Sequence, residues 1–346
     1  MPDLATLPQP FGRADARGVG ITDRRIERAV ERGDLTRLAK GLYAVRSPWD
    51  ALPPWVRHEH LARAGVRLTP DAIVSHLSAA VLLGLPHPAY EPSKVTMTLL
   101  DDSRTSRTDA WRRFHRGATP PAHVVIVARR PHLIAARTVV DCIRDLHPRD
   151  ALAITDAALR RGLCSRSNLD AMRRHQVHWP GIAGADDVLR VTDPRRENWL
   201  ESVSAWALHS HGLPCGVPQV TVLDRAGRFV ARADAVWPDL ALVGEADGRG
   251  KYELGTGGAV GGDLGETLRR NVHAERIREN RLRDLGLDVM RWDTGDALRV
   301  TPLADRFCAA RERADPGRVR ARFLCGCCRR DLSDCPRTTQ KRALSA

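Results

Sequence analysis

The first fifty residues show a helical pattern of apolar positions followed by a strand pattern. Between Thr22 and Gly33 the apolar residues recur at helical spacing, at Ile26, Ala29 and Val30. Thr22 can cap this helix and Gly33 can end it. The next segment, 35–45, holds two short β-rich runs around a Lys-Gly pair, which is typical of a hairpin. The pattern therefore predicts helix, turn, helix and hairpin over residues 1–50.

The segment 56–178 has the pattern of a mixed domain with a strongly apolar centre. Its most apolar stretch runs from Ala72 to Leu85, and Ser75 and His76 interrupt that stretch. A Ser-His pair on an Ala/Leu-rich helix is more often a hydrogen-bonded core pair than a catalytic one. We therefore expect these two residues to be structural.

The segment 193–305 shows the pattern of an α/β domain. Asp193 followed by Pro194 predicts a helix start, because Asp caps helices and Pro suits the first helical position. Three β-rich runs, a helix and a buried strand follow, at 218–224, 228–237, 240–248, 265–285 and 286–292. This order predicts a mixed central sheet. A basic tail, 311–346, shows almost no apolar periodicity.

Length and composition fit a folded, multidomain α+β protein. The chain has 346 residues, of which 42% are hydrophobic and 28% charged, so it exceeds one ordinary domain and is neither disordered nor fibrous. No apolar run reaches the roughly 18 residues of a membrane-spanning helix. The N-terminus lacks a basic start followed by an apolar block. We expect a cytoplasmic protein that does not bind membranes.

The chain is strongly basic. Lys and Arg number 55 against 42 acidic residues, a formal charge of +13, and only four of the basic residues are lysines. A surplus of this sign favours a polyanion such as DNA, because neutralised phosphates release counterions. An arginine-rich codon bias is the alternative explanation.

A basic stripe marks the predicted N-terminal helix. Arg24, Arg28 and Arg32 recur every four residues opposite the apolar face, Arg25 lies beside them, and Lys40 stands at the hairpin turn. A basic stripe on a second helix, followed by a hairpin, suits docking in the DNA major groove with a wing on the backbone. A solvated arginine face on a small helical domain is the alternative.

These residues resemble the winged-helix N-terminal domain of the AbiEi-like antitoxin family. The similarity lies in TDRRIERAVERGDLTRLAKGLYAV, and VSHLSAAVLLGLP and ARTVVDCIRD extend it into an AbiEi-like middle domain, residues 56–178. It covers roughly the first half of the chain. The resemblance implies a winged helix-turn-helix over 1–50, DNA binding that often serves autoregulation, and a toxin as the partner gene product.

Carboxylates interrupt the predicted strands of the third domain. Asp234 lies in a run otherwise suited to burial, and Glu245 and Asp247 alternate along the next strand, which points both to one face. If these strands are neighbours, Asp234 and Glu245 converge, and Glu201 can reach them from the opening helix. Crowded buried carboxylates need protons or a cation. Oxygen ligands favour magnesium or manganese, and Lys251 lies just beyond as a source of positive charge.

The acidic series resembles the PD-(D/E)XK nuclease fold, most closely its very-short-patch-repair-like branch. The resemblance implies a restriction-endonuclease-like domain over 193–305. In it Asp234 and Glu245 would bind the metal, Glu201 would be an accessory ligand and the carbonyl of Ala246 would add an oxygen. A glutamine before the first strand, Gln219, also matches.

One position departs from that resemblance. The lysine expected two residues after the glutamate is replaced by Asp247, and Lys251 is the candidate for the missing ammonium. If Lys251 points elsewhere, the fold could be kept for binding without cleavage. The helix that follows is rich in arginine, at Arg276, Arg278, Arg281 and Arg283. These arginines either hold phosphates beside the metal or form a solvated face with Glu275 and Glu279 as partners.

The tail holds four of the eight cysteines: Cys325, Cys327, Cys328 and Cys335. Zinc is disfavoured there, because no histidine helps and the spacing is irregular. The fourth ligand beside the CxxC pair and Cys335 would be Cys327 or the distant Cys308. We expect instead a disordered basic extension with reactive thiols.

The leading hypothesis from the sequence is a winged helix that delivers a magnesium-dependent endonuclease to DNA, where it hydrolyses phosphodiester bonds. The alternative is a non-catalytic transcriptional regulator or antitoxin of a type IV toxin-antitoxin system. The sequence specifies no oligomeric state.

Overall fold

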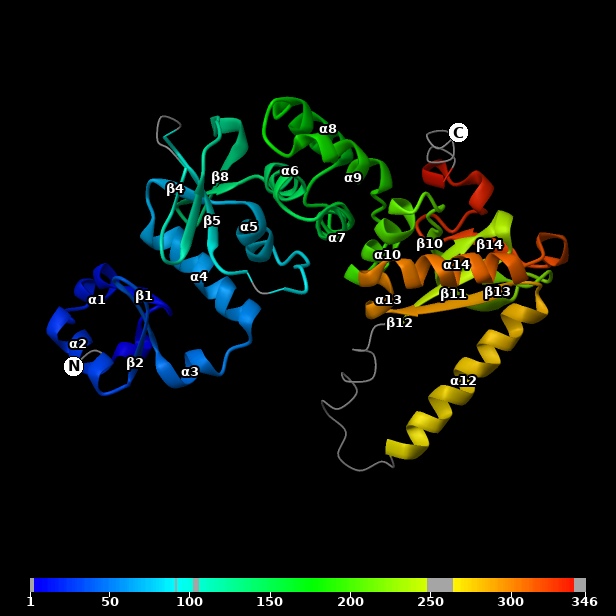
Figure 1. Ribbon diagram of the computed structural model, residues 1–346, viewed down its shortest axis with the longest axis horizontal. Coiled ribbons are helices and arrows are strands. Elements are labelled where there is room, and N and C mark those ends of the chain that lie inside the picture. Colours follow the sequence, from blue (N-terminus) through cyan, green and yellow to red (C-terminus); the bar gives the residue numbers. More distant parts are fainter. Residues whose placement is uncertain (1–2, 91, 102–105, 248–263, 339–346) are drawn as a thin grey trace. The chain divides into compact units, whose positions relative to one another are not determined.

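The computed structural model describes residues 3–90, 92–101, 106–247 and 264–338, without the side chains of 264–272. The chain forms two compact units (Figure 1). The N-terminal unit comprises Met1–Leu146 and Gly162–Ala185, and the C-terminal unit comprises His147–Arg161 and Asp186–Ala346. Each unit is described by itself below.

The N-terminal unit opens with two short helices and a three-stranded antiparallel sheet of order β1-β3-β2. The elements are η1 (Leu4–Thr6), β1 (Phe11–Gly12), α1 (Arg13–Gly18), α2 (Asp23–Glu31), β2 (Leu35–Ala39) and β3 (Leu42–Val45). Their core includes Phe11, Ile26 and Tyr43, one from each of β1, α2 and β3. The predicted helix, turn, helix and hairpin are confirmed.

The rest of the N-terminal unit is a mixed domain around a four-stranded sheet of order β4-β5-β7-β6. Its elements are α3 (Arg46–Asp50), α4 (Pro54–Leu68), β4 (Ala72–Val74), α5 (His76–Leu82), β5 (Val95–Leu99), β6 (Arg107–Thr108), β7 (Arg112–His115), η2 (Pro121–His123), β8 (Val124–Val127), β9 (Arg130–Leu133), α6 (Ala135–Asp145), α8 (Arg166–His175) and η3 (Ile182–Gly184). Ser75 and His76 are buried and hydrogen-bonded to each other, Oγ to Nδ1 at 2.8 Å, as the structural interpretation expects.

The C-terminal unit is built on a five-stranded sheet of order β13-β12-β11-β10-β14. Its elements are α7 (Pro148–Arg160), α9 (Ala185–Val191), α10 (Trp199–Ser210), β10 (Val217–Leu223), β11 (Phe229–Trp237), η4 (Pro238–Leu240), β12 (Leu242–Asp247), α12 (Leu264–Asp284), β13 (Asp288–Asp293), α13 (Thr294–Arg299), α14 (Thr301–Arg313), η6 (Pro316–Arg318), β14 (Arg322–Cys325) and η7 (Leu332–Asp334). The pair β12–β13 is parallel and the other pairs are antiparallel. The predicted order of elements and the mixed sheet are therefore observed.

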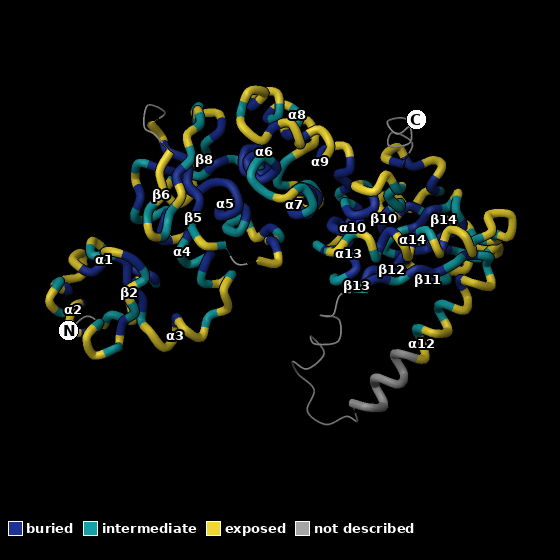
Figure 2. The backbone as a smooth tube through the Cα atoms, viewed as in Figure 1, coloured by how far each residue is buried: buried dark blue, intermediate teal, exposed yellow. Residues whose placement is uncertain are grey.

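Both faces of this sheet carry a core. Along β12, Leu242 and Ala246 belong to a cluster with α10, α13 and α14, whereas Val243 belongs to a second cluster with α12 and the tail. This alternation is the one that a strand buried on both faces requires. Figure 2 shows β12 as mostly buried and the described part of α12 as mostly exposed.

The predicted middle domain, residues 56–178, includes the segment of α7. In the structure α7 belongs instead to the C-terminal unit. Asp156 of α7 is buried and accepts hydrogen bonds from the Arg196 guanidinium at 2.7 Å, the Ser202 hydroxyl at 2.9 Å and the Asp193 backbone at 2.7 Å. These bonds attach α7 to α10 and to the segment before it. Sequence periodicity predicts a helix but does not say which neighbour the helix packs against.

The helix predicted to open at Asp193-Pro194 begins later, at Trp199. Asn198 caps it, because its side-chain oxygen accepts a hydrogen bond from the Glu201 backbone at 3.0 Å. Asp193 is instead buried and paired with Arg195 at 2.7 Å. Asp193 therefore forms a buried ion pair with Arg195 and does not cap α10.

The expectation of a disordered tail is wrong for residues 311–338. Residues 311–313 end α14, and β14 then joins the sheet as an antiparallel edge strand beside β10. Leu332 and Cys335 are buried in the core on that side of the sheet. Ordering comes from long-range pairing with β10, which a lack of local periodicity does not reveal.

Candidate functional site

Three elements bring predicted acidic residues into one hydrogen-bonded series. Glu201 lies in the first turn of α10, Gln219 on β10 and Asp234 on β11. The amide Nε2 of Gln219 donates to Glu201 Oε2 at 3.0 Å and to Asp234 Oδ1 at 3.4 Å. The Gln219 amide therefore bridges the carboxylates of Glu201 and Asp234. Gln219 holds this position with a left-handed backbone, φ +55°.

Glu201 is buried, with 6% of its surface exposed. It accepts further hydrogen bonds from the Asn198 amide at 2.6 Å and from the Glu197 backbone at 2.9 Å. Burial raises the pKa of Glu201 to about 7, even though the donors from Gln219 and Glu197 oppose the shift and the Asp234 charge adds to it. This carboxyl group therefore exchanges its proton near neutral pH.

Asp234 lies where β11 and β12 separate. The two strands pair from Ala235 opposite Gly244 to Trp237 opposite Leu242. Beyond this ladder Asp234 Oδ2 accepts the next backbone hydrogen bond, from Ala246 at 2.9 Å. The Asp234 carboxylate thus takes the place of a backbone acceptor at the end of the β11–β12 ladder. Its residue is half-buried there.

Glu245 follows Gly244, the last paired residue of β12, so that continuing the β11–β12 register by one residue sets it across from Asp234. It is 7% exposed, and its Oε1 accepts a hydrogen bond from Arg278 Nη1 of α12 at 2.8 Å. Burial raises the pKa of Glu245, which the Arg278 guanidinium partly offsets and the Asp234 charge reinforces. The neighbouring strands therefore place the two predicted ligands across from each other, with an arginine on one of them.

The basic group beside Glu245 in the described part of the chain is Arg278. Arg278 also pairs with Glu275 at 2.5 Å, one helical turn away. The interpretation of these arginines as a face partnered by Glu275 and Glu279 predicts the pair with Glu275, whereas neither interpretation predicts the contact with Glu245.

Asp247 and Lys251 complete the predicted set. Asp247 lies 3.6 Å from Arg291 of β13, which also pairs with Glu279 at 3.4 Å. Asp247 is thus engaged by a neighbouring strand and more exposed than Glu245. Lys251 lies outside the described residues.

The structure separates Glu201 from the other two predicted metal ligands. Asp234 and Glu245 present carboxylates from adjacent strands, whereas the Gln219 amide stands between Glu201 and Asp234. Among the described residues, one group of three or more His, Cys, Asp or Glu side chains has its ligand atoms within 4.8 Å of one another. That group is the four cysteines of the tail. The Gln219 amide thus lies between the carboxylates of Glu201 and Asp234.

The predicted DNA-binding residues lie on α2 and the hairpin after it. Thr22 caps α2 by accepting from the Arg25 backbone at 3.4 Å, and Ile26 and Ala29 face the core. Arg24, Arg28 and Arg32 are exposed and Arg25 is half-buried. The stripe and its apolar opposite face are therefore arranged as the sequence predicts.

Arginines of α1 engage the acidic side chains of α2. Arg17 lies 2.6 Å from Asp23, and Arg13 lies 3.3 Å from Asp23 and 3.6 Å from Glu27. The hydrogen bond from Arg17 is the main reason that the pKa of Asp23 is lowered. Of the predicted arginines, Arg32 pairs with Asp34 at 2.9 Å.

Three of the predicted arginines of α2 remain available. Arg24, Arg25 and Arg28 form no ion pair with any carboxylate in the part of the chain that the structure describes. Their charge is therefore not neutralised within the protein at close range.

The hairpin after α2 presents two more basic side chains. β2 and β3 pair up to Ala39 opposite Leu42, so that Lys40 lies exposed at the tip. Gly41 takes φ +79°, a conformation that favours glycine in this turn. Arg37, on β2, is also exposed. Arg37 takes an exposed position in the alternation of buried and exposed residues along β2. This alternation could have predicted Arg37 as a further DNA-binding residue.

Two helices beside a three-stranded sheet, two strands of which form the β2–β3 hairpin after α2, make this region helix-turn-helix-like, and the helix-turn-helix class commonly binds DNA. Residues 2–46 match the family described as "Transcriptional regulator, AbiEi antitoxin". Over 225 residues the chain is 29% identical to the uncharacterized proteins MT2308 and Rv2248 of two Mycobacterium tuberculosis strains. That similarity covers 65% of this chain and 78% of each relative.

The family match supports the DNA-binding regulator better than the endonuclease. It falls on the domain that carries the exposed arginines and does not extend to the acidic series. None of the helices in the described residues is long and apolar enough to cross a membrane.

Proposed function

We propose that this protein is a DNA-binding transcriptional regulator of the antitoxin type, which contacts DNA through α2 and the β2–β3 wing. The observation that carries the proposal is the winged-helix domain over residues 2–46, with its family match and its exposed arginines. α2 would lie in the major groove while the wing rests on the phosphate backbone.

The charges of this domain support a phosphate-binding surface. Residues 2–46 contain nine basic and six acidic side chains. Because Arg13 and Arg17 engage acids of α2, the exposed positive charge concentrates on the unpaired arginines of α2 and on Arg37 and Lys40 of the wing. Such groups release counterions when they meet phosphates.

Binding to a duplex that contains the region upstream of the gene tests this proposal. We expect the double variant Arg24→Ala/Arg28→Ala to weaken binding on the order of tenfold, since it removes two phosphate contacts. Arg166→Ala is the matched control, because Arg166 is exposed on α8 and paired with Asp170. An unrelated duplex of equal length separates specific from general affinity. Equal affinity of the double variant and the intact protein on both duplexes contradicts the proposal.

The family resemblance also extends the proposal to a toxin partner. The gene next to this one would then encode the toxin, and expressing that toxin alone would arrest growth. Co-expression of the present protein should restore growth, and the Arg24→Ala/Arg28→Ala variant should lose promoter binding. A neighbouring gene product without toxicity would contradict the toxin-antitoxin part and leave DNA binding intact.

A second candidate function is metal-dependent hydrolysis of phosphodiester bonds in the C-terminal unit. It is supported by one arrangement: Asp234 and Glu245 lie on adjacent strands, and Gln219 links Asp234 to Glu201, whose pKa is raised by burial to about 7. Magnesium or manganese bound by Asp234 and Glu245 would supply a Lewis acid for a phosphate oxygen. In this protein's own structure, Gln219 orients Asp234, and Arg278 would need to leave Glu245 or share it with the ion.

Nuclease assays on supercoiled plasmid and on single- and double-stranded oligonucleotides, with magnesium and then manganese, test this second function. We expect cleavage that Asp234→Asn and Glu245→Gln each abolish and that Asp239→Asn, an exposed acid in the neighbouring η4, leaves unchanged. No cleavage of any substrate by the intact protein, or cleavage that survives both substitutions, would remove the enzymatic function.

A further inference from the structure

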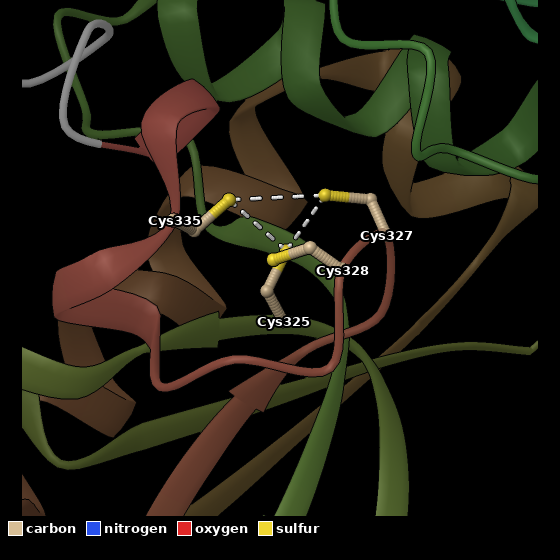
Figure 3. A group of neighbouring side chains, drawn as sticks. All are labelled: Cys325, Cys327, Cys328 and Cys335. Atoms are coloured by element: carbon tan, nitrogen blue, oxygen red, sulfur yellow. Dashed lines mark hydrogen bonds between the residues drawn. The ribbon is translucent and has the colours of Figure 1, made fainter.

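Four cysteine side chains of the C-terminal segment converge on one point (Figure 3). Cys325 ends β14, Cys327 and Cys328 lie in the turn after it, and Cys335 follows η7. The Sγ of Cys325 lies 3.1 Å from that of Cys327 and 3.3 Å from that of Cys335, and Cys327 lies 3.7 Å from Cys335. All four sulfurs lie within 4.8 Å of one another.

These separations suit a single tetrahedral ion. Zn–S bonds of about 2.3 Å place the sulfurs of a zinc tetrathiolate roughly 3.8 Å apart. An iron–sulfur cluster distributes its cysteines over two or more iron atoms and holds them further apart. All four cysteines are free thiols in the structure. The set therefore matches a closed Cys₄ site of the structural kind.

The backbone that carries the cysteines is held in place by the sheet. The Arg329 backbone donates to the Cys325 carbonyl, and the Cys325 backbone donates to the Arg330 carbonyl, each at 2.8 Å, which closes the turn. Gly326 packs so tightly that a Cβ on it would overlap the carbonyl oxygen of Gln219 on β10. Three of the four sulfurs thus come from a hairpin that is fixed against β10.

A buried arginine donates to this cluster. Arg195 is 7% exposed, and its Nη1 lies 3.5 Å from the Cys325 sulfur and 3.0 Å from the Thr338 hydroxyl. Its other guanidinium nitrogens bind Asp193. N–H donors beside ligating thiolates stabilise their negative charge, and such outer partners orient metal ligands. A metal with four thiolates carries a net negative charge, which Arg195 and the neighbouring Arg329 and Arg330 would offset.

We propose that Cys325, Cys327, Cys328 and Cys335 bind one structural zinc ion, which fastens β14 and the segment after it to the edge of the sheet. The four thiols lose their protons to solvent when the ion binds. The site reverses the sequence-based preference for a metal-free tail. The irregular CxCC spacing works because Cys325 ends a strand while the other two cysteines lie in its turn.

The zinc site also supports the acidic series. Cys325 lies opposite Val220 in the β10–β14 ladder, directly after Gln219, and Gly326 packs on the Gln219 carbonyl. Gln219 in turn donates to Glu201 and Asp234. Loss of the ion should therefore loosen Gln219 as well as the tail, whether or not the acidic series is catalytic.

Metal analysis of the full-length protein, purified with reductant and without chelator, tests the proposal. We expect close to one zinc ion per chain. Cys327→Ser and Cys335→Ser should each lose most of the zinc, whereas Cys308→Ser should keep it, because Cys308 lies on α14 and outside the group. Chelation should lower the melting temperature of the intact protein and leave that of Cys327→Ser nearly unchanged.

Cobalt titration keeps the test independent of how well the variants fold. The intact protein, stripped of metal under reducing conditions, should take up one Co²⁺ with the thiolate-to-cobalt absorption of a tetrahedral tetrathiolate site, and Zn²⁺ should displace it. Absence of zinc together with absence of this absorption would overturn the proposal. So would disulfides among these four cysteines in freshly prepared protein, or full zinc content in the Cys327→Ser/Cys335→Ser double variant.

Discussion

Buried histidines of the N-terminal unit are held neutral by their surroundings. His58 lies in the core with its Nε2 3.0 Å from the Ser78 hydroxyl, and its Nδ1 has no hydrogen-bond partner among the described residues. Burial, with a smaller contribution from His87, lowers the pKa of His58 to about 4. His76, whose ring stacks on His115 at 3.9 Å, also has a lowered pKa because it is buried.

These shifts predict that the N-terminal unit loses stability in mild acid. An unfolded chain protonates histidine near pH 6.5, whereas folded His58 stays neutral down to about pH 4. The unfolded state therefore takes up the proton first, and the free energy of unfolding falls as the pH drops from 6.5 to 4. His58 alone contributes roughly 3 to 3.5 kcal/mol to this loss over the whole range, of which about 2 kcal/mol is lost by pH 5. Calorimetric unfolding of the intact protein at pH 7.5 and pH 5 measures it.

The variant His58→Gln should show a smaller difference between the two pH values. His178→Gln, which alters an exposed histidine of the same unit, should behave like the intact protein. An equal pH dependence of all three proteins would mean that His58 is not held neutral in the fold.

At the scale of elements, a buried polar network joins α7 to α10. Asp156 accepts three hydrogen bonds, of which the ion pair with Arg196 is almost fully buried on both sides. Removing one partner of such a pair leaves an uncompensated buried charge, which is costly. This network explains why α7 belongs to the C-terminal unit.

The substitution Asp156→Ala should lower the free energy of unfolding of the C-terminal unit by about 3 to 5 kcal/mol, because Arg196 and Ser202 lose their acceptor. Arg228→Ala is the matched control in the same unit, since it breaks the ion pair of the exposed Arg228 with Asp224, which contributes about 1 kcal/mol or less. Urea unfolding of both variants measures the contrast. Similar losses in the two variants would show that burial does not set the cost.

Local patterns in the sequence were sufficient for the strands and the winged helix. The alternation through Asp234 and Glu245 predicted β11 and β12, and the Thr22 and Gly33 signals predicted α2 with its boundaries almost correct. These features depend on residues close together in the chain. A capping residue or a period of two is therefore enough to find them.

Contacts between residues far apart in the sequence determine the features of the fold and the site that the sequence did not predict. The neighbour of α7, the Arg278–Glu245 contact and the pairing of β14 with β10 join residues far apart in sequence. The arginines of α12 had two plausible roles because periodicity places a side chain on a face without naming its partner. The spacing of the four cysteines was judged irregular for the same reason, since strand and turn geometry brings them together.

The whole molecule contains a helix-turn-helix-like region in its N-terminal unit and a second compact unit built on a five-stranded sheet. The formal charge of +13 exceeds what residues 2–46 contribute, so much of the basic surplus lies elsewhere in the chain. Affinity for DNA can therefore include contributions from both units. The specific claim is narrower: the exposed arginines of α2 make phosphate contacts.

The salt dependence of DNA binding tests that claim most directly. Each phosphate contact contributes about 0.9 to the slope of log affinity against log salt concentration on duplex DNA. For the intact protein and for Arg24→Ala/Arg28→Ala, the slope is measured on the upstream duplex across a range of salt concentrations. We predict that the slope of the variant is smaller by about 2, whereas Arg166→Ala keeps the slope of the intact protein. An unchanged slope in the α2 variant would contradict the account.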